Sequence, residues 1–294
     1  MKIGTQTAIL DKAFGPNKAL DIIKKVGFES VDYSLMREEL VDMSYGDLKK
    51  HFSTIKNHAD QLDLPIVQTH TPFYNYNTML ARYDEIIEIQ KKALMATAYL
   101  GAKYAIVHPL MPPERIYDQD YDRTKELNMK YYSALIPSLK EHDIFIAVEN
   151  MFAVDPYIRE ICPTTCTTAE EMVDYIDSLG ERFVACLDVG HANLIHQEGY
   201  EHVNQEHMIK TLGHRLQTLH LHDNDGKSDQ HFPPYMGTID WDLVMRSLKE
   251  INYPGVLMLE CDILIKQMYP EFMEMGKEVY YAAVKRLADI SKKY

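Results

Sequence analysis

A chain of 294 residues is long enough for two average domains or for one α/β barrel of about 250 residues with additional loops. Its hydrophobic fraction of 46% and charged fraction of 26% are typical of a folded globular protein and exclude an intrinsically disordered chain. The net charge of −13 provides no broad basic face, so nucleic acid is disfavoured as a partner.

Eight short β-rich runs recur along the chain, and their starts are roughly 30 to 40 residues apart, the length of one βα unit. The expected strands begin at Lys2, Ser30, Pro65, Tyr104, Ile144, Phe183, Leu216 and Gly255. No linker rich in proline, glycine or serine interrupts the series. This rhythm predicts a parallel sheet built by repeated strand–helix units.

The segments between these strands carry apolar residues at three- and four-residue spacing, which predicts amphipathic helices. The clearest expected helices cover residues 19–27, 83–102, 129–142, 169–180 and 241–251. Several of them end with a glycine just before the next strand, as at Gly27, Gly101 and Gly180, which is typical of helix C-caps.

Eight such units predict one closed (β/α)8 TIM barrel that forms a single domain over residues 1–294. A doubly wound open sheet is the alternative fold. It is disfavoured because the glycine-rich phosphate fingerprint GxGxxG does not follow the first strand.

The beginning of the chain, MKIGTQTAIL, has no apolar run long enough for a signal peptide, and no window approaches the length of a membrane span. The four cysteines are too few and too scattered for a disulfide framework. We therefore expect a cytoplasmic protein with reduced thiols and no membrane partner.

Polar side chains stand at or just beyond the carboxyl ends of six expected strands, where a TIM barrel places its active site. These residues are His70, His108, Glu149, Asp188, His191, His222, Asp229, His231 and Glu260. One such residue is more often hydrogen-bonded or solvated than a ligand, but their coincidence favours a site. Apolar strands that end in Glu149 and Glu260 need a cation, because buried carboxylates are costly unless they are paired or metal-bound.

Three carboxylates and one imidazole form the predicted metal site, namely Glu149, Asp188, His222 and Glu260. This donor set suits one catalytic divalent ion, with Mn²⁺ as our first choice and Co²⁺, Mg²⁺ or Zn²⁺ as alternatives. His220 lies one strand step before His222 on the same face. We expect it deeper in the barrel, in a packing or hydrogen-bonding role beside the ligands.

Seven short motifs are spread over nearly the whole chain. They are HTPF at His70, VHP at Val107, VEN at Val148, LDVGH at Leu187, HLHDND at His220, HFPPYMGTIDW at His231 and MLE at Met258. In this combination the chain resembles the xylose isomerase-like barrel superfamily of sugar isomerases and epimerases, which also contains endonuclease IV.

The resemblance to the ketose 3-epimerase-like branch implies that the four predicted ligands hold one divalent metal. Glu149 and Glu260 would also exchange protons with a substrate carbon next to a carbonyl, through an enediolate. A small-molecule sugar or sugar derivative is the expected partner, and a homo-oligomer is left open. Substrate contacts are expected from His70, His108, His191, Asp229, His231 and Tyr74, the last with loop packing as its alternative.

Two positions depart from the patterns of known branches. Ser228 stands where the epimerase-like branch carries an arginine that contacts the substrate, so the sugar stays open. Met151 stands where xylose isomerase has a lysine, so its hydride-shift machinery is not supported.

Three other functions compete with the isomerase or epimerase. A metal-dependent lyase or dehydratase on a keto-sugar or keto-inositol, including the C-glycoside-cleaving type, uses the same enolisation. Endonuclease IV-like phosphodiesterases hold three zinc ions with nine ligands, and the nine polar residues above offer a counterpart to each. The acidic composition and the lack of basic loops favour the sugar enzyme. A non-catalytic binding barrel would have little reason to keep both glutamates.

Overall fold

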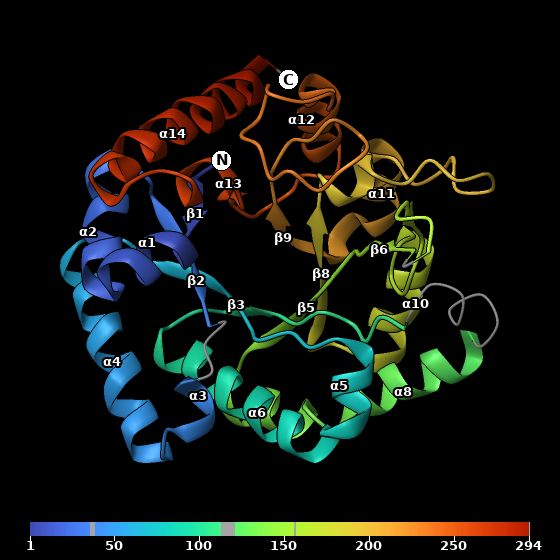
Figure 1. Cartoon of the computed structure of the whole chain (residues 1–294), viewed down its shortest axis with the longest axis horizontal. Helices are drawn as coiled ribbons and strands as arrows, with labels where there is room; N and C mark the ends of the chain where they lie inside the picture. The colour runs from blue at the N-terminus through green and yellow to red at the C-terminus, as the bar shows by residue number, and fades with distance from the viewer. Residues whose placement is uncertain (36–38, 113–120, 156, 294) are drawn as a thin grey trace.

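Eight parallel strands form the centre of the protein, and helices surround them (Figure 1). The computed structural model describes residues 1–35, 39–112, 121–155 and 157–293. The barrel strands are β1 (Ile3–Gln6), β2 (Ser30–Ser34), β3 (Ile66–His70), β4 (Tyr104–Ile106), β5 (Phe145–Glu149), β8 (Phe183–Asp188), β9 (Leu216–His220) and β10 (Leu257–Leu259). Each predicted strand is present, so the predicted TIM barrel is confirmed.

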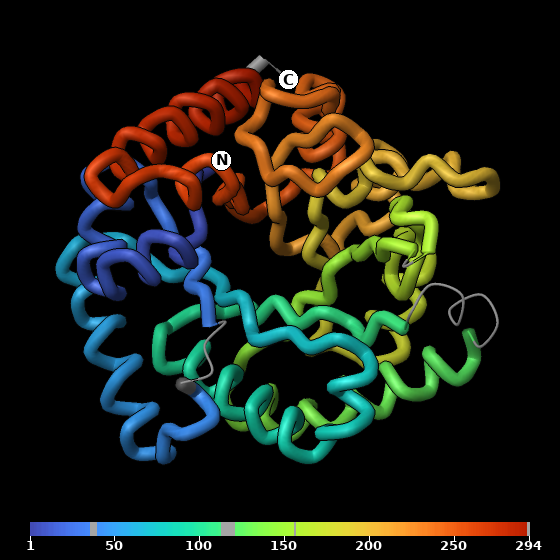
Figure 2. Tube along the Cα trace, in the orientation of Figure 1, coloured from blue at the N-terminus to red at the C-terminus, as the bar shows by residue number. Residues whose placement is uncertain are grey.

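The sheet nearly closes on itself. From β1 to β9, each barrel strand pairs in parallel with the next barrel strand, and β1 also pairs with β10. Between β9 and β10, Leu221 N donates a hydrogen bond to Met258 O at 2.8 Å, and Glu260 N donates to Leu221 O at 3.1 Å. The first and last segments of the chain therefore lie side by side (Figure 2), which a doubly wound open sheet does not allow.

Helices alternate with the strands and cover the outside of the barrel. They are α1 (Ala8–Phe14), α2 (Pro16–Val26), α3 (Glu39–Asp42), α4 (Tyr45–Gln61), α5 (Tyr76–Ala81), α6 (Tyr83–Tyr99), α8 (Tyr121–Ser133), α9 (Ile136–His142), α10 (Ala169–Leu179), α11 (Gln205–Leu212), α12 (Trp241–Glu250), α13 (Ile263–Lys266) and α14 (Met273–Ile290). Among the described residues, no helix is long and apolar enough to cross a membrane.

Local sequence signals explain most helix ends. Gly27 adopts a left-handed backbone with φ of 113° and caps α2, as predicted. The predicted helix over 129–142 is instead divided between α8 and α9, because Pro137 has no N–H and cannot continue a helix from α8. A short antiparallel pair, β6 (Ala153–Val154) and β7 (Ile161–Cys162), follows β5 and was not predicted, because two residues show no periodicity.

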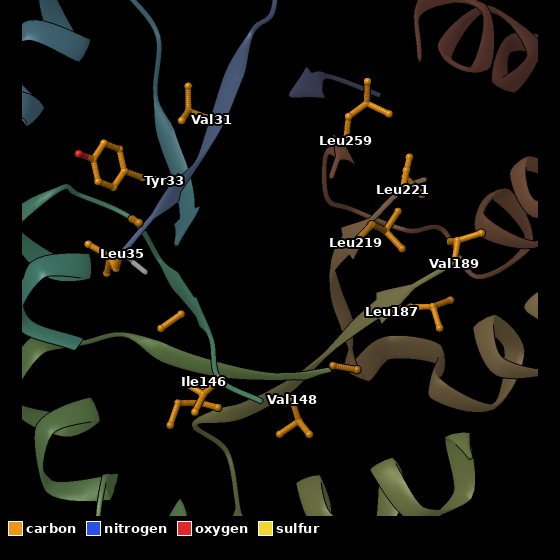
Figure 3. Close-up of a cluster of buried hydrophobic side chains, with 14 of the residues drawn as sticks. Val31, Tyr33, Leu35, Ile146, Val148, Leu187, Val189, Leu219, Leu221 and Leu259 are labelled. Carbon is orange, nitrogen blue, oxygen red and sulfur yellow. The ribbon is translucent and has the colours of Figure 1, made fainter. Parts of the chain in front are cut away.

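Alternation along the strands decides which side chains face the barrel interior. Val148, Leu187 and Leu219 are buried and point away from the interior toward the helices (Figure 3). Successive residues of a strand point to opposite faces, so the residue after each of these faces inward. Glu149, Asp188 and His220 therefore face inward, and Glu260 follows the outward-pointing Leu259 in the same way (Figure 3).

One carboxylate organises the long loop between β9 and α12. Asp223 accepts hydrogen bonds from Trp241 Nε1 at 2.9 Å, Tyr235 N at 3.0 Å and Ile239 N at 3.2 Å. Trp241 begins α12 and is only 2% exposed. The tryptophan therefore anchors this helix to the loop.

Replacing Trp241 by Phe keeps an aromatic ring at the start of α12 but removes the hydrogen bond to Asp223. We expect the free energy of unfolding to fall by about 1.5–3 kcal/mol, the range for hydrogen bonds to charged groups. Urea denaturation followed by circular dichroism measures the change. The exposed Tyr45→Phe variant is the control and should change stability by less than about 0.5 kcal/mol. Equal losses in the two variants would contradict this role of Trp241.

Candidate active site

A cavity of about 510 Å³ opens at the carboxyl ends of the strands. Such a position and size are typical of a small-molecule site in a TIM barrel. The predicted site residues that line the cavity are His70, His108, Glu149, His191, Asp229, His231 and Glu260.

His220 lies at the centre of the buried charges. Its Nδ1 is 2.6 Å from Glu149 Oε1 and 3.2 Å from Glu260 Oε2, while its Nε2 is 2.9 Å from Asp32 Oδ2. One ligand atom from each of Glu149, Asp188, His220 and Glu260 lies within 4.8 Å of the others. We call these four residues the central group, and their spacing allows them to hold one metal ion.

His222, the predicted imidazole ligand, lies outside the central group. Its Nε2 is 3.0 Å from Asp188 Oδ1 and 3.6 Å from Asp229 Oδ1, and no described ion pair joins it to either glutamate of the central group. The strand register explains this placement, because Asp188 is paired with His220 across β8 and β9. His222 is one strand step further toward the loops, whereas the Nδ1 of His220 lies beside the two glutamates.

A second cluster, the outer group, consists of His191, His222, Asp229 and His231. Their ligand atoms also lie within 4.8 Å of one another. The rings of His222 and His231 stack with centroids 3.9 Å apart, and His231 Nε2 is 2.9 Å from Asp229 Oδ2. Gly190 makes room for this stack, because a Cβ atom there would lie only 2.0 Å from His222 Cε1.

A third cluster consists of His70 and His108 with Glu149, and it contacts Oε2 of Glu149, whereas His220 contacts Oε1. His108 Nε2 is 2.9 Å from Glu149 Oε2 and 3.1 Å from His70 Nε2. Phe73 stacks on the His108 ring at a centroid distance of 4.9 Å and lines the cavity. Tyr74 was predicted to contact the sugar, with loop packing as the alternative. It packs against the hydrophobic core and is not among the described residues that line the cavity.

The two glutamates have opposite pKa shifts. Burial raises the pKa of Glu260 to about 8, because the charges of His220 and His231 offset only part of the desolvation. Burial acts on Glu149 in the same direction, but the charge of His220, its hydrogen bond to Oε1 and the close contact of His108 with Oε2 lower the pKa of Glu149 well below 4.5. In the metal-free protein at neutral pH, Glu149 is therefore ionised while Glu260 is mainly protonated.

The pKa values of the histidines are also shifted in different directions. Burial lowers the pKa of His70 to about 4, and the neighbouring His108 adds to this effect. Burial lowers the pKa of His222 despite a nearby aspartate. For His231, burial is outweighed by the hydrogen bond to Asp229 and by nearby carboxylates, and the pKa rises to about 10. His70 and His222 are thus neutral, with lone pairs available for ligands.

Several buried atoms of these clusters make no hydrogen bond. They are Glu149 Oε2, Asp188 Oδ2, Asp229 Oδ1, His222 Nδ1 and His222 Nε2. Unpaired buried oxygen and nitrogen atoms are costly, and they are the donor types that divalent metals prefer. The residues present therefore fit a metal ion.

Sequence reasoning missed residues that support the predicted ones. Asn150 donates through Nδ2 to Asp188 O at 2.9 Å, accepts from Asp188 N at 2.6 Å, and its carbonyl accepts from His191 Nδ1 at 2.8 Å. Its position in the VEN motif was a usable signal. Asp32, which contacts His220, carried no such signal, because it stands alone in its strand.

The model of the xylose isomerase-like TIM barrel family matches residues 20–278. Among curated relatives, an uncharacterised protein (MJ1311) of Methanocaldococcus jannaschii is 28% identical over 78% of this chain and 77% of its own. An inosose isomerase of Bacillus velezensis is 25% identical over 82% of this chain and 81% of its own. A D-psicose 3-epimerase of Enterocloster bolteae is 26% identical over 49% of this chain and 41% of its own.

Solved structures agree with the family match. A D-tagatose 3-epimerase-like protein superposes with a TM-score of 0.75 at 20% identity and covers 100% of this chain and 99% of that one. The IOLI protein with a bound zinc atom gives a TM-score of 0.70 at 20% identity, covering 100% of this chain and 99% of that one. The chain therefore belongs to the xylose isomerase-like TIM barrel family.

The raised pKa of Glu260 predicts how the metal-free protein responds to pH. Because its folded pKa of about 8 exceeds the ordinary value of 4.5, its contribution to stability is fully present below pH 4.5 and is lost as the pH rises through 8. Glu260→Gln cannot ionise. We expect its melting temperature relative to wild type to rise between pH 4 and pH 9 in excess chelator.

Differential scanning fluorimetry at these two pH values makes the measurement. The exposed Glu126→Gln variant is the control, and its difference from wild type should be the same at both pH values. An equally constant difference for Glu260→Gln would contradict a raised pKa.

Proposed function

We propose that this protein is a divalent-metal-dependent sugar isomerase or epimerase that moves a proton next to a carbonyl group. The observation that carries the proposal is the pair of glutamates at the cavity, which have opposite pKa shifts and share contacts with one histidine. Two carboxyl groups in different protonation states can serve as the general base and the general acid of one reaction. The D-psicose 3-epimerase and the inosose isomerase among the relatives support this class.

The central group, Glu149, Asp188, His220 and Glu260, would hold the metal. A bound divalent ion would supply Lewis-acid polarisation of the substrate oxygens. We choose His220 over the predicted His222 because its Nδ1 faces both glutamates, whereas His222 faces Asp188 and Asp229. Mn²⁺ remains our first choice, since three of the four donors are carboxylates.

The glutamates would perform the proton transfers. Glu149, ionised in the metal-free protein, would accept the proton of the carbon next to the carbonyl, and Glu260 would return one. Return from the opposite face inverts the carbon, which is epimerisation. Proton transfer from the first carbon to its neighbour would instead give an isomerase. The same enolisation serves a lyase or dehydratase, so product analysis separates these reactions.

The histidines around the cavity would bind the substrate hydroxyls. The neutral ring of His70 offers Nε2 as an acceptor, because its Nδ1 donates to Thr71 O at 3.1 Å. His231 forms part of the cavity wall, and its two ring nitrogens contact Glu260 O at 2.7 Å and Asp229 Oδ2 at 2.9 Å. Phe73 and Phe152 line the same cavity and offer apolar surface to the C–H face of a sugar. His108 and His191 complete this wall, and Asp229 holds His231 in place.

We expect Glu149→Gln and Glu260→Gln each to lower turnover by about 10²–10⁴-fold, the usual range for a general acid or base. The test begins with wild type: metal analysis of protein purified without added metal, then a screen of keto- and aldo-sugars for incorporation of deuterium from solvent. The active sugar is then used for both variants. Near-native turnover of either variant would exclude the two-glutamate mechanism.

A second function, the trinuclear phosphodiesterase, is favoured by one specific observation. Five overlapping groups of candidate ligands occur among the described residues, and three of them are the central group, the outer group and the cluster of His70 and His108 with Glu149. Glu149 belongs to both the central group and that cluster. The outer group lies next to Asp188 and has enough donors for an ion of its own. Three zinc ions with cleavage of abasic DNA would establish this function in place of the first.

His231→Ala separates the two functions. For the isomerase or epimerase we expect one retained metal per chain and a KM raised about tenfold, because the cavity wall loses the His231 ring and Asp229 loses the partner that holds it in place. For the phosphodiesterase the same change removes an outer-group ligand and lowers the metal count. Atomic absorption and steady-state kinetics beside wild type measure both quantities, and an unchanged KM and metal count would remove His231 from the site.

A further inference from the structure

We propose that Asp32 is a positioning residue of the metal centre, which accepts the Nε2–H of His220 and thereby presents the Nδ1 of that ring to the metal. The inference rests on the proposed function, because it takes His220 as a metal ligand. Asp32 lies on β2, whereas the four residues of the central group lie on or directly after β5, β8, β9 and β10.

The contact geometry fixes the orientation of the ring. Asp32 Oδ2 is 2.9 Å from His220 Nε2, and both side chains are at most 1% exposed. The other ring nitrogen faces Glu149 and Glu260. The Asp32 oxygen accepts a hydrogen bond from Nε2, so Nε2 keeps its proton, and Nδ1 is the ring nitrogen that a metal would bind after displacing its proton.

Asp32 is itself held in place. Gln68 Nε2 donates a hydrogen bond of 2.9 Å to the same Oδ2 atom, and Gln68 is buried on β3. Three neighbouring side chains from β2, β3 and β9 thus form a connected polar chain across the barrel interior. A carboxylate that orients a metal-bound imidazole also raises its basicity, and such partners are common in metal sites.

Packing alone does not explain a carboxylate at this position. Ile106, Ala147 and Cys186 form an apolar cluster in the interior of the barrel, which shows that apolar side chains can fill this region. Burying a charge costs several kcal/mol unless it has a partner. Asp32 does not appear among the described residues that line the cavity, so its effect on the site passes through His220.

The test is the affinity of the folded protein for Mn²⁺ alone, measured by calorimetric titration after removal of metal with chelator. We expect Asp32→Ala to weaken binding about 10–100-fold, the range for partners of metal ligands. Asp32→Asn keeps a hydrogen-bond acceptor without the charge and should lie between Asp32→Ala and wild type. His220→Ala should abolish binding at the central group.

Asp11→Asn is the matched control, because Asp11 is also a buried aspartate but accepts its hydrogen bond from Tyr33, a residue of the hydrophobic core. It should bind Mn²⁺ as wild type does. Co²⁺ absorption spectra add a readout that a structural role would not change: the visible band should shift in Asp32→Asn and not in Asp11→Asn. Thermal melts of the metal-free proteins confirm folding.

The outcomes separate the two proposals. Wild-type affinity and an unchanged Co²⁺ band in both Asp32 variants, with binding lost in His220→Ala, would overturn the role of Asp32 and leave the metal centre intact. Wild-type protein that binds no divalent metal would overturn the proposed function and this inference together. Graded loss from wild type through Asp32→Asn to Asp32→Ala supports the inference.

Discussion

Charge balance around one buried imidazole is the constraint on which this site depends. His220 contacts Asp32, Glu149 and Glu260 at 2.6–3.2 Å, in a region from which water is almost excluded. Three carboxylates cannot all be ionised there beside a single imidazolium. In the metal-free protein the excess is removed by keeping Glu260 protonated, and a divalent cation would offset the remaining negative charge.

The barrel supplies the geometry that makes this crowding possible. Parallel strands bring their carboxyl ends to one rim, and outward apolar residues such as Val148 and Leu187 fix each strand against its helices. The polar residue that follows each of them faces the interior, because successive side chains of a strand point to opposite faces. Backbone hydrogen bonds between the strands fix this rim. Side-chain hydrogen bonds of Asn150 and Asp223 then fix the loops that follow the strands.

Shared residues connect the two functions that this site can support. Glu149 contacts both His108 and His220, and Asp188 lies between the central and outer groups. One metal in the central group leaves the surrounding histidines free to bind hydroxyl groups. Metals in all three groups would use the same histidines as ligands and leave none for a sugar. The number of bound ions would therefore distinguish the two proposed functions.

The sequence by itself determined the eight strands, the barrel and the rim on which Glu149, Asp188 and Glu260 lie, because strand alternation and motif order are local properties. It favoured His222 over His220 as the metal ligand, but a period of two places both on the same face and does not measure their distance from the glutamates. Depth along the barrel is set by register with a neighbouring strand, and pairing with Asp188 placed His220 beside the glutamates. The contact of Asp32 with His220 spans 188 residues, and only strand closure brings such distant residues together.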